Sequence, residues 1–214
     1  MAVLETKTIA YNGDGVSSSM WIAFDSIKKE NYRSFLDSLS SNLYDNALWL
    51  ISYEIYIPDE YILTVAPNVT LVANGGFFST TLTGILRSNT YSTGQTQPQV
   101  SENSTRISSN FEKIFDDKLN FAGTWGVKVA QPEWFGYGSN SGVDDSIKIQ
   151  KAINLIHISY STGNEIFYGG RVECRPLSSQ YSIMNSISIP LGVSFDGGNS
   201  NFIYKIADGT EDIP

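Results

Sequence analysis

The sequence has very few of the residues on which most metal sites and nucleophilic triads depend. Its 214 residues include one cysteine, Cys174, and one histidine, His157. A single cysteine excludes a disulfide within the chain and a cysteine-rich metal site, and a single histidine argues against most zinc and triad chemistry. We therefore expect no cofactor and no metal. Cys174 is expected to fill a small apolar space in a strand, and His157 to lie just past a helix, on the surface or near the negative end of the helix dipole.

Charged residues and long apolar runs are also scarce. Asp, Glu, Lys and Arg make up 17% of the chain, the net charge is −8, and no run of basic residues occurs. Because binding to a phosphate backbone depends on clustered Lys and Arg, nucleic acid is not an expected partner. No apolar run is long enough to cross a bilayer, and residues 1–5 lack the basic start and apolar core of a signal peptide. We expect a protein made in a cytoplasm, with no signal peptide and no membrane insertion.

Tyrosine and phenylalanine, by contrast, are abundant, with 12 and 11 copies, and glycine, serine, threonine and asparagine are frequent. This composition suits many short strands separated by turns. Runs of β-preferring residues at 47–56, 62–65 and 69–72 are separated by proline turns and lead to a Gly-Gly pair. Residues 187–198 repeat this order. Such a repeat fits a solenoid, in which each winding of the chain stacks on a neighbour to bury its apolar face.

Two segments show the periodicity of amphipathic helices. Residues 18–43 predict one long or two short helices, with an apolar face formed by Met20, Ala23, Phe24, Ile27, Tyr32, Phe35, Leu36 and Leu39. The other helix begins after Asp144 and Asp145, either of which can act as its N-cap. Its apolar face consists of Ile149, Ala152, Ile153 and Ile156.

The second helix belongs to a longer motif between Gln131 and Ile156. A predicted aromatic strand end is followed by a Gly/Ser/Asn loop and then by the capped helix. The run Pro132-Glu133-Trp134-Phe135-Gly136, with Asp144-Asp145 before the helix, resembles the entry segment of pectate-lyase-like right-handed β-helices, especially that of bacteriophage tailspikes and related polysaccharide depolymerases. The resemblance covers roughly residues 119–205. It departs from the family pattern in the loop at 137–142 and at 168–171, where Tyr-Gly-Gly-Arg replaces a Leu-Pro-Pro-Gly turn.

The resemblance implies a mainly β protein, in which a right-handed parallel β-helix begins at the entry motif and is capped by a helix. Residues 1–87 are expected to form a smaller α+β module of helices and strands that resembles the entry region and is a candidate for particle attachment. Residues 88–110 are rich in Ser, Thr, Asn and Gln and predict a polar linker or loop. Residues 111–214 are expected to start the β-helix.

No constellation of residues identifies a catalytic centre. Hydrolysis of a polysaccharide needs two carboxyl groups that face the sugar, about 5 to 9.5 Å apart. Asp144 and Asp145 are adjacent, but consecutive residues at a helix start point in different directions, and the acidic pairs at 59–60 and 116–117 are expected in turns. The best polar stripe alternates along a predicted strand and consists of Arg171, Glu173 and Arg175. We favour a solvent-facing strand edge for this stripe, and the catalytic residues stay unassigned.

The sequence leaves more than one function open. The resemblance implies a tailspike or tail fibre component of the virion: an N-terminal attachment and β-helix entry region that forms a homotrimer and contacts other tail proteins. Such a region would support recognition of host surface polysaccharide through a longer protein. The alternatives are a polysaccharide depolymerase of the β-helix class, acting as glycosidase or lyase, and a bacterial surface β-helix adhesin. Because about 58 residues follow Ile156, enough for about two windings of ~20 to 30 residues, we expect this segment itself not to be catalytic.

Overall fold

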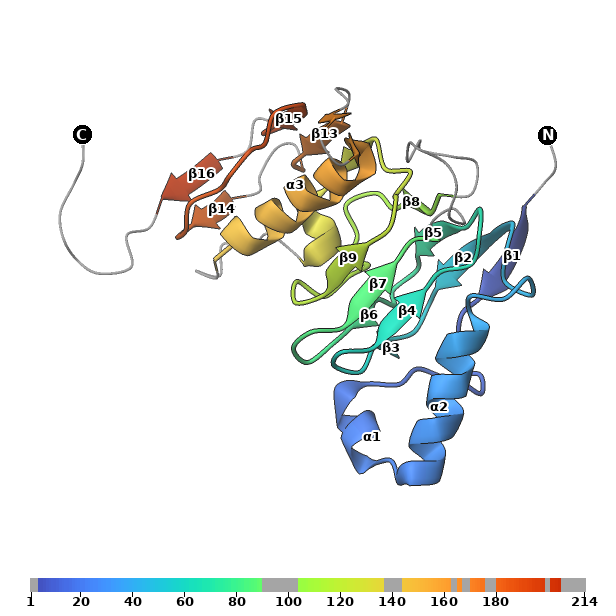
Figure 1. Cartoon of the computed structure of the whole chain (residues 1–214). Helices are drawn as coiled ribbons and strands as arrows, with labels where there is room; N and C mark the ends of the chain where they lie inside the picture. The colour runs from blue at the N-terminus through green and yellow to red at the C-terminus, as the bar shows by residue number, and fades with distance from the viewer. Residues whose placement is uncertain are drawn as a thin grey trace.

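The computed structural model describes residues 4–89, 104–136, 144–162, 165–166, 170–175, 180–198 and 201–204, and it combines helices with many short strands (Figure 1). The helices are α1 (Ser18–Ala23), α2 (Ser26–Ser38), the 3₁₀-helix η1 (Pro132–Phe135) and α3 (Ser146–Tyr160). The strands before η1 are β1 (Glu5–Thr8), β2 (Ala47–Ile51), β3 (Ile55–Tyr56), β4 (Ile62–Thr64), β5 (Thr70–Ala73), β6 (Phe78–Ser79), β7 (Ile85–Arg87), β8 (Arg106–Ser108), β9 (Asn120–Ala122) and β10 (Val129–Ala130). Those after α3 are β11 (Ser161–Thr162), β12 (Glu165–Ile166), β13 (Gly170–Glu173), β14 (Gln180–Ile183), β15 (Val193–Asp196) and β16 (Asn201–Tyr204).

The strands up to β9 form three small sheets in which all paired neighbours are parallel. The strand orders are β1-β2-β5-β8, β3-β6 and β4-β7-β9. The chain passes through the sheets in the same order twice, first as β2, β3 and β4 and then as β5, β6 and β7. We call one such passage a winding. Paired residues of these two windings are 22 positions apart in the first sheet and 23 in the other two, as for Ile55 opposite Phe78.

Successive windings approach closely at the corner before the second sheet. A Cβ atom on Gly76 would lie 2.2 Å from the amide nitrogen of Tyr53, and one on Gly15 would lie 3.1 Å from the carbonyl oxygen of Glu54. The residues that follow this corner, Val16, Ile55 and Phe78, pair with one another in that order. The turn at 52–54 is therefore enclosed between two glycines, because only glycine leaves room for backbone at these distances.

The buried apolar side chains of the described residues form one core, to which the strands and helices contribute. In β2, Ala47, Trp49 and Ile51 are buried, and the two residues between them are half-buried. The largest fully buried side chains of the neighbouring windings are Trp49, Phe78, Phe115 and Trp125. The strands predicted at 47–56, 62–65 and 69–72 are thus confirmed, with a break at 52–54 where the chain turns the corner.

Residues 18–43 contain two short helices, which is one of the two alternatives that the periodicity predicts. Helix α2 covers part of the first winding. The Tyr32 hydroxyl donates a hydrogen bond to the Tyr56 carbonyl at 2.8 Å, and Leu36 and Leu39 are buried. The apolar face predicted for this second part is confirmed.

The apolar face predicted for the first part is wrong for three of its four residues, whereas Phe24 is partly buried and packs against the core. Met20, Ala23 and Ile27 are all exposed. Helix α1 ends at Ala23, with Phe24 as its C-cap, and the Asp25 carboxylate accepts a hydrogen bond from the Lys28 amide at the start of α2. This N-cap starts a new helix in place of a continuous one, so that the spacing of apolar residues across the break does not place them on one face.

Beyond β9 the strands form smaller groups, and α3 lies beside β13 and β15 (Figure 1). The sheet β10-β13-β15 and the pair β14-β16 are parallel, whereas β11 and β12 are antiparallel. Paired residues are 23 positions apart between β13 and β15, and 21 between β14 and β16. Helix α3 contacts η1, β10 and β13. Its predicted apolar face is confirmed, since Ile149, Ala152, Ile153 and Ile156 are completely buried.

The structure is therefore a mixture of helices and small, mostly parallel sheets. The prediction of a mainly β protein is corrected, because helices contribute as well. The prediction of short parallel strands is confirmed. Residues 90–103 of the predicted linker lie outside the described residues. At its end, β8 pairs with β5 at an offset of 36 residues, and β9 pairs with β7 at an offset of 35. Strands on both sides of the linker thus share sheets, and the division into separate modules stays a prediction.

Candidate functional site

The entry motif starts with a helical turn, and the predicted aromatic strand end is wrong. The segment Pro132–Phe135 forms η1 directly after β10, and all four of its residues are buried. Proline has no amide hydrogen to continue a strand ladder, and its fixed φ suits the first turn of a helix. The Trp134 carbonyl accepts hydrogen bonds from the amides of Ile114 and Phe115, at 3.0 and 2.8 Å. The turn thereby holds the chain against residues 114 and 115, the second of which pairs with Phe78 of β6.

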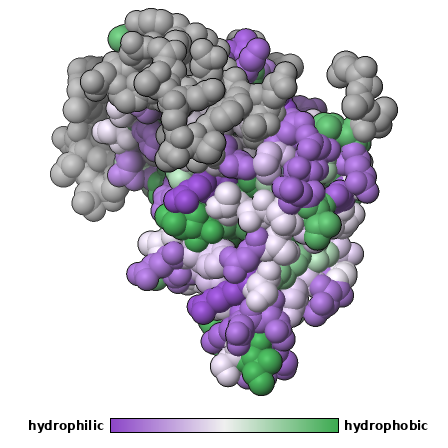
Figure 2. All heavy atoms as spheres, turned by 45° about the vertical axis from the view of Figure 1, so that its right-hand side comes forward, coloured by the Kyte–Doolittle hydropathy of each residue, from purple (hydrophilic) through white to green (hydrophobic). Residues whose placement is uncertain are grey.

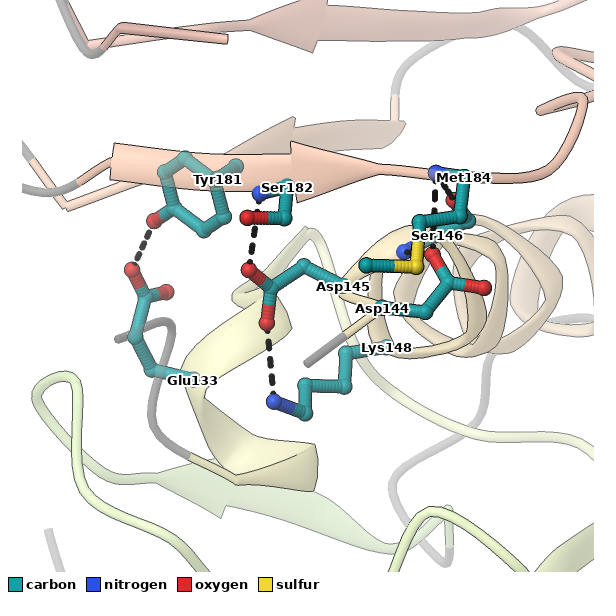
Figure 3. Close-up of polar contacts among 8 residues, drawn as sticks. All are labelled: Glu133, Asp144, Asp145, Ser146, Lys148, Tyr181, Ser182 and Met184. Atoms are coloured by element: carbon teal, nitrogen blue, oxygen red, sulfur yellow. Dashed lines mark hydrogen bonds and ion pairs between the residues drawn. The ribbon is translucent and has the colours of Figure 1, made fainter. Parts of the chain in front are cut away.

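Glu133 places a carboxylate inside the protein. Its side chain is 2% exposed, and its Oε1 accepts a hydrogen bond from the Arg175 amide at 2.9 Å. The same oxygen accepts a hydrogen bond from the Tyr181 hydroxyl (Figure 3). Burial, with the adjacent Glu133 carboxylate, raises the pKa of Tyr181 above its ordinary value, so that the phenol stays a donor. Glu133 Oε2 has no hydrogen-bond partner in the described part of the chain.

Asp145 connects α3 to β14. It is 1% exposed, and its Oδ1 lies 2.8 Å from the Lys148 ammonium, which is also buried. Its Oδ2 accepts from the Ser182 amide at 3.0 Å, and its own amide donates to the Ser182 carbonyl at 2.8 Å (Figure 3). Asp145 occupies the position before the first helical residue, as predicted, but its carboxylate binds a strand amide and a lysine. The two hydrogen bonds to the Ser182 backbone fix where β14 meets the helix, and the ion pair with Lys148 holds the Asp145 carboxylate in place.

Asp144 makes a second connection of the same kind. Its Oδ1 accepts from the Ser146 amide at 2.9 Å and from the Met184 amide at 3.2 Å, and its Oδ2 accepts from the Asn185 side chain. Partial burial opposes ionisation, but the hydrogen bonds outweigh it and hold the pKa of Asp144 below its ordinary value. Both aspartates therefore have structural partners, and Asp144 is the one whose side chain reaches the first helical amide.

The structure separates the predicted polar stripe. Arg171 and Glu173 lie on the same face of β13 and form an ion pair at 3.0 Å. Arg175 lies beyond the end of the strand, and its amide donates to Glu133. The two residues between them, Val172 and Cys174, are buried. The stripe is thus an exposed ion pair followed by a backbone contact to the entry motif.

The single cysteine and histidine occupy ordinary positions. Cys174 is completely buried, as predicted, and burial raises the pKa of its thiol to about 12. His157 lies in the last turn of α3, not past its end, because the helix continues to Tyr160. A basic residue in the last turn is favoured by the helix dipole.

One arrangement was not recognised from the sequence. Burial, followed by a hydrogen bond with Asp116 and the charge of that neighbour, raises the pKa of Asp117. The charges of Lys148 and Lys113 oppose this shift. A raised carboxyl pKa is a property of general acids. The sequence shows that Asp116 and Asp117 are adjacent. It does not show that Asp117 is partly buried, or that it lies near Lys148, about thirty residues further along the chain in α3.

Lys151 connects α3 to the same region. Its ammonium donates to the Leu119 carbonyl at 2.8 Å and to Asn120 Oδ1 at 3.1 Å. Burial lowers the pKa of Lys151, while the charges of Asp117 and Asp116 act in the opposite direction. The Asp116 carboxylate also accepts from the Lys118 amide at 3.1 Å, a turn contact that agrees with its predicted place in a turn.

The described residues contain no group of three or more His, Cys, Asp or Glu side chains that could hold a metal ion. None of the described helices is long and apolar enough to span a membrane. No protein-family model matches the sequence, and neither curated protein sequences nor solved structures show a significant similarity to it.

Proposed function

We propose that this chain is the N-terminal region of a tailspike-like virion protein. In this proposal it forms the first windings of a right-handed parallel β-helix, attaches the protein to the viral particle, and supports recognition of host surface polysaccharide by the whole protein. The observation that carries the proposal is that the first two windings are paired in all three sheets at nearly the same offset, 22 or 23 residues. The entry motif at Pro132–Gly136 resembles that family independently of this offset.

The shared offset supports a solenoid for a geometric reason. When one passage of the chain contributes one strand to each of three parallel sheets, the next passage stacks on it if its strands follow in the same order, and connections of similar length then give nearly equal offsets in all three sheets. The corner at Gly15, Tyr53 and Gly76 stacks in the same order as the strands. Offsets of 23 and 21 residues recur between β13 and β15 and between β14 and β16.

The two N-terminal helices supply a candidate surface for attachment. Helix α1 has no buried residue, and the exposed fractions are 42% for Met20, 74% for Ile22 and 68% for Ile27. Figure 2 shows hydrophobic surface at the tip formed by these helices. Exposed apolar side chains that gather at one place are typical of a surface that another protein covers. In the proposal, that protein is another component of the viral tail.

The proposed assembly is a homotrimer, which light scattering on the purified chain tests directly. We expect a mass three times that of the 23.6 kDa chain, because unpaired strand edges and exposed apolar side chains favour association. The mass is measured at several concentrations and in high salt, since a specific trimer persists where weak ionic contacts are screened. A monomer at all concentrations would contradict the trimer and remove one support of the proposed function.

The raised pKa of Asp117 favours a second candidate function, a polysaccharide depolymerase. We nevertheless expect no cleavage by this chain, because Asp116 is a turn residue and the buried carboxylates Glu133 and Asp145 already have structural partners. The test incubates the chain with capsular, lipopolysaccharide and exopolysaccharide preparations and follows new reducing ends and unsaturated products. Cleavage by the wild type that is lost in Asp117→Asn, with folding unchanged, would establish the enzyme instead.

A further inference from the structure

A cavity lies beside the corner between β5 and β6 and reaches Glu133 of the entry motif. Its volume is about 480 Å³. The residues that line it include Phe77, Phe111, Glu112, Lys113 and Glu133. Cavities of about 300 to 1,000 Å³ are typical of small-molecule sites. The lining combines aromatic side chains with charged groups of both signs.

The cavity already holds one cationic group of the protein itself. The Lys113 ammonium lies 3.9 Å from the centroid of the Phe77 ring. At this distance the negative face of the aromatic ring attracts a cation. Lys113 is exposed and has a flexible side chain, so that its ammonium can leave the ring at little structural cost. The contact shows that this ring face accepts an ammonium group.

Two carboxylates line the same space. Glu112 is exposed, and Glu133 is buried. The groups that donate to Glu133 Oε1 are a neutral amide and a neutral phenol, and Oε2 has no hydrogen-bond partner among the described residues. The two carboxylates lie in a chain of net charge −8. The local and overall charge therefore both favour a cation.

The second aromatic side chain is held in place by its backbone. Phe111 has a φ of 56°, a region that a bulky side chain rarely adopts. Its amide donates to Gln131 Oε1 at 2.7 Å, and Gln131 is almost completely buried. This contact to the residue before η1 keeps Phe111 at the wall of the cavity.

We propose that this cavity binds an organic cation with a primary ammonium or guanidinium group, which stacks on Phe77 and displaces Lys113. Lys113 is then an internal competitor that occupies the site when no ligand is bound. The proposal goes beyond the proposed function and does not depend on it, since it requires neither a trimer nor a β-helix.

The test is a titration of the whole chain with methylguanidinium chloride, followed by NMR of ¹³C-labelled phenylalanine rings at constant ionic strength. We expect saturable shifts of the Phe77 and Phe111 rings. N-methylurea has nearly the same shape without the charge and serves as the neutral control, for which we expect no saturable shift. Acetyl-arginine amide is titrated in parallel: tighter binding than methylguanidinium indicates a protein side chain as the natural ligand, and weaker binding indicates a small molecule.

Two variants separate the stacking from simple filling of space. Phe77→Leu keeps apolar volume but removes the ring face, and we expect roughly two- to fivefold weaker binding. Lys113→Ala removes the competitor, and we expect tighter binding. Far-UV circular dichroism checks that both variants are folded. Equal binding of N-methylurea and methylguanidinium, unchanged affinity in a folded Phe77→Leu, or weaker binding in Lys113→Ala would each overturn the proposal.

Discussion

Replacing Gly76 by alanine is expected to lower the free energy of unfolding by about 3 kcal/mol or more. A Cβ atom at this position would lie 2.2 Å from the Tyr53 nitrogen and 2.3 Å from the Tyr53 oxygen. Both contacts are with backbone, so that no side chain can move aside and the two windings must separate. The loss corresponds to a fall in the melting temperature of roughly 6 to 12 °C for a chain of this size.

The neighbouring residue supplies a matched control. Gly75 has a φ of 85°, but a Cβ atom there would meet nothing within 4 Å. Gly75→Ala therefore costs only the left-handed backbone conformation, about 1 to 2 kcal/mol. Urea unfolding of both variants measures the difference. If the two alanine variants had equal stability, the close approach of the windings at this corner would not exist in solution.

Replacing Asp145 by alanine is expected to lower the free energy of unfolding by about 3 to 5 kcal/mol, the usual cost of leaving one partner of a buried ion pair behind. Lys148 would lose this carboxylate in a buried position, and the Ser182 amide would lose its acceptor. A lost N-cap alone would cost about 1 kcal/mol. The size of the loss therefore distinguishes a buried connection from a surface cap.

The double variant Asp145→Ala/Lys148→Met tests this assignment. Removing the lysine charge is expected to recover part of the stability, and a deficit of about 1 to 3 kcal/mol is expected to remain from the unpaired Ser182 amide. Asp144→Ala serves as a comparison, with a loss of about 1 to 2 kcal/mol, because Asp144 is only partly buried. A double variant no more stable than Asp145→Ala would refute the buried ion pair.

Repeating patterns in the sequence predicted much of the local structure. The spacing of Tyr32, Leu36 and Leu39, and that of Ile149, Ala152 and Ile153, identified the buried faces of α2 and α3, because one side of each helix contacts the core. The strand segments between residues 47 and 72 were recognised for a similar reason. Periodicity failed at α1, where the cap at Asp25 divides one apolar pattern between two helices.

The contacts of the candidate site could not be predicted in the same way. Glu133 meets Tyr181 across 48 residues, and Asp145 meets Ser182 across 37. No local pattern encodes such partners, because α3 and β13 lie between them in the sequence and tertiary packing brings them together. The sequence identified Glu133, Asp144 and Asp145 as members of a motif, and the structure adds what each of them binds. The raised pKa of Asp117 likewise depends on burial that its own neighbours in sequence do not indicate.

The long connection between β7 and β8 shows which lengths in this protein are free to change. Paired residues in the first two windings are 22 or 23 positions apart, and in the next they are 35 or 36 apart, yet the strands remain paired in parallel. Extra residues in this connection therefore do not shift the alignment of the strands that follow. A connection of different length is therefore expected to be tolerated at this place, as long as β5 still pairs with β8 and β7 with β9.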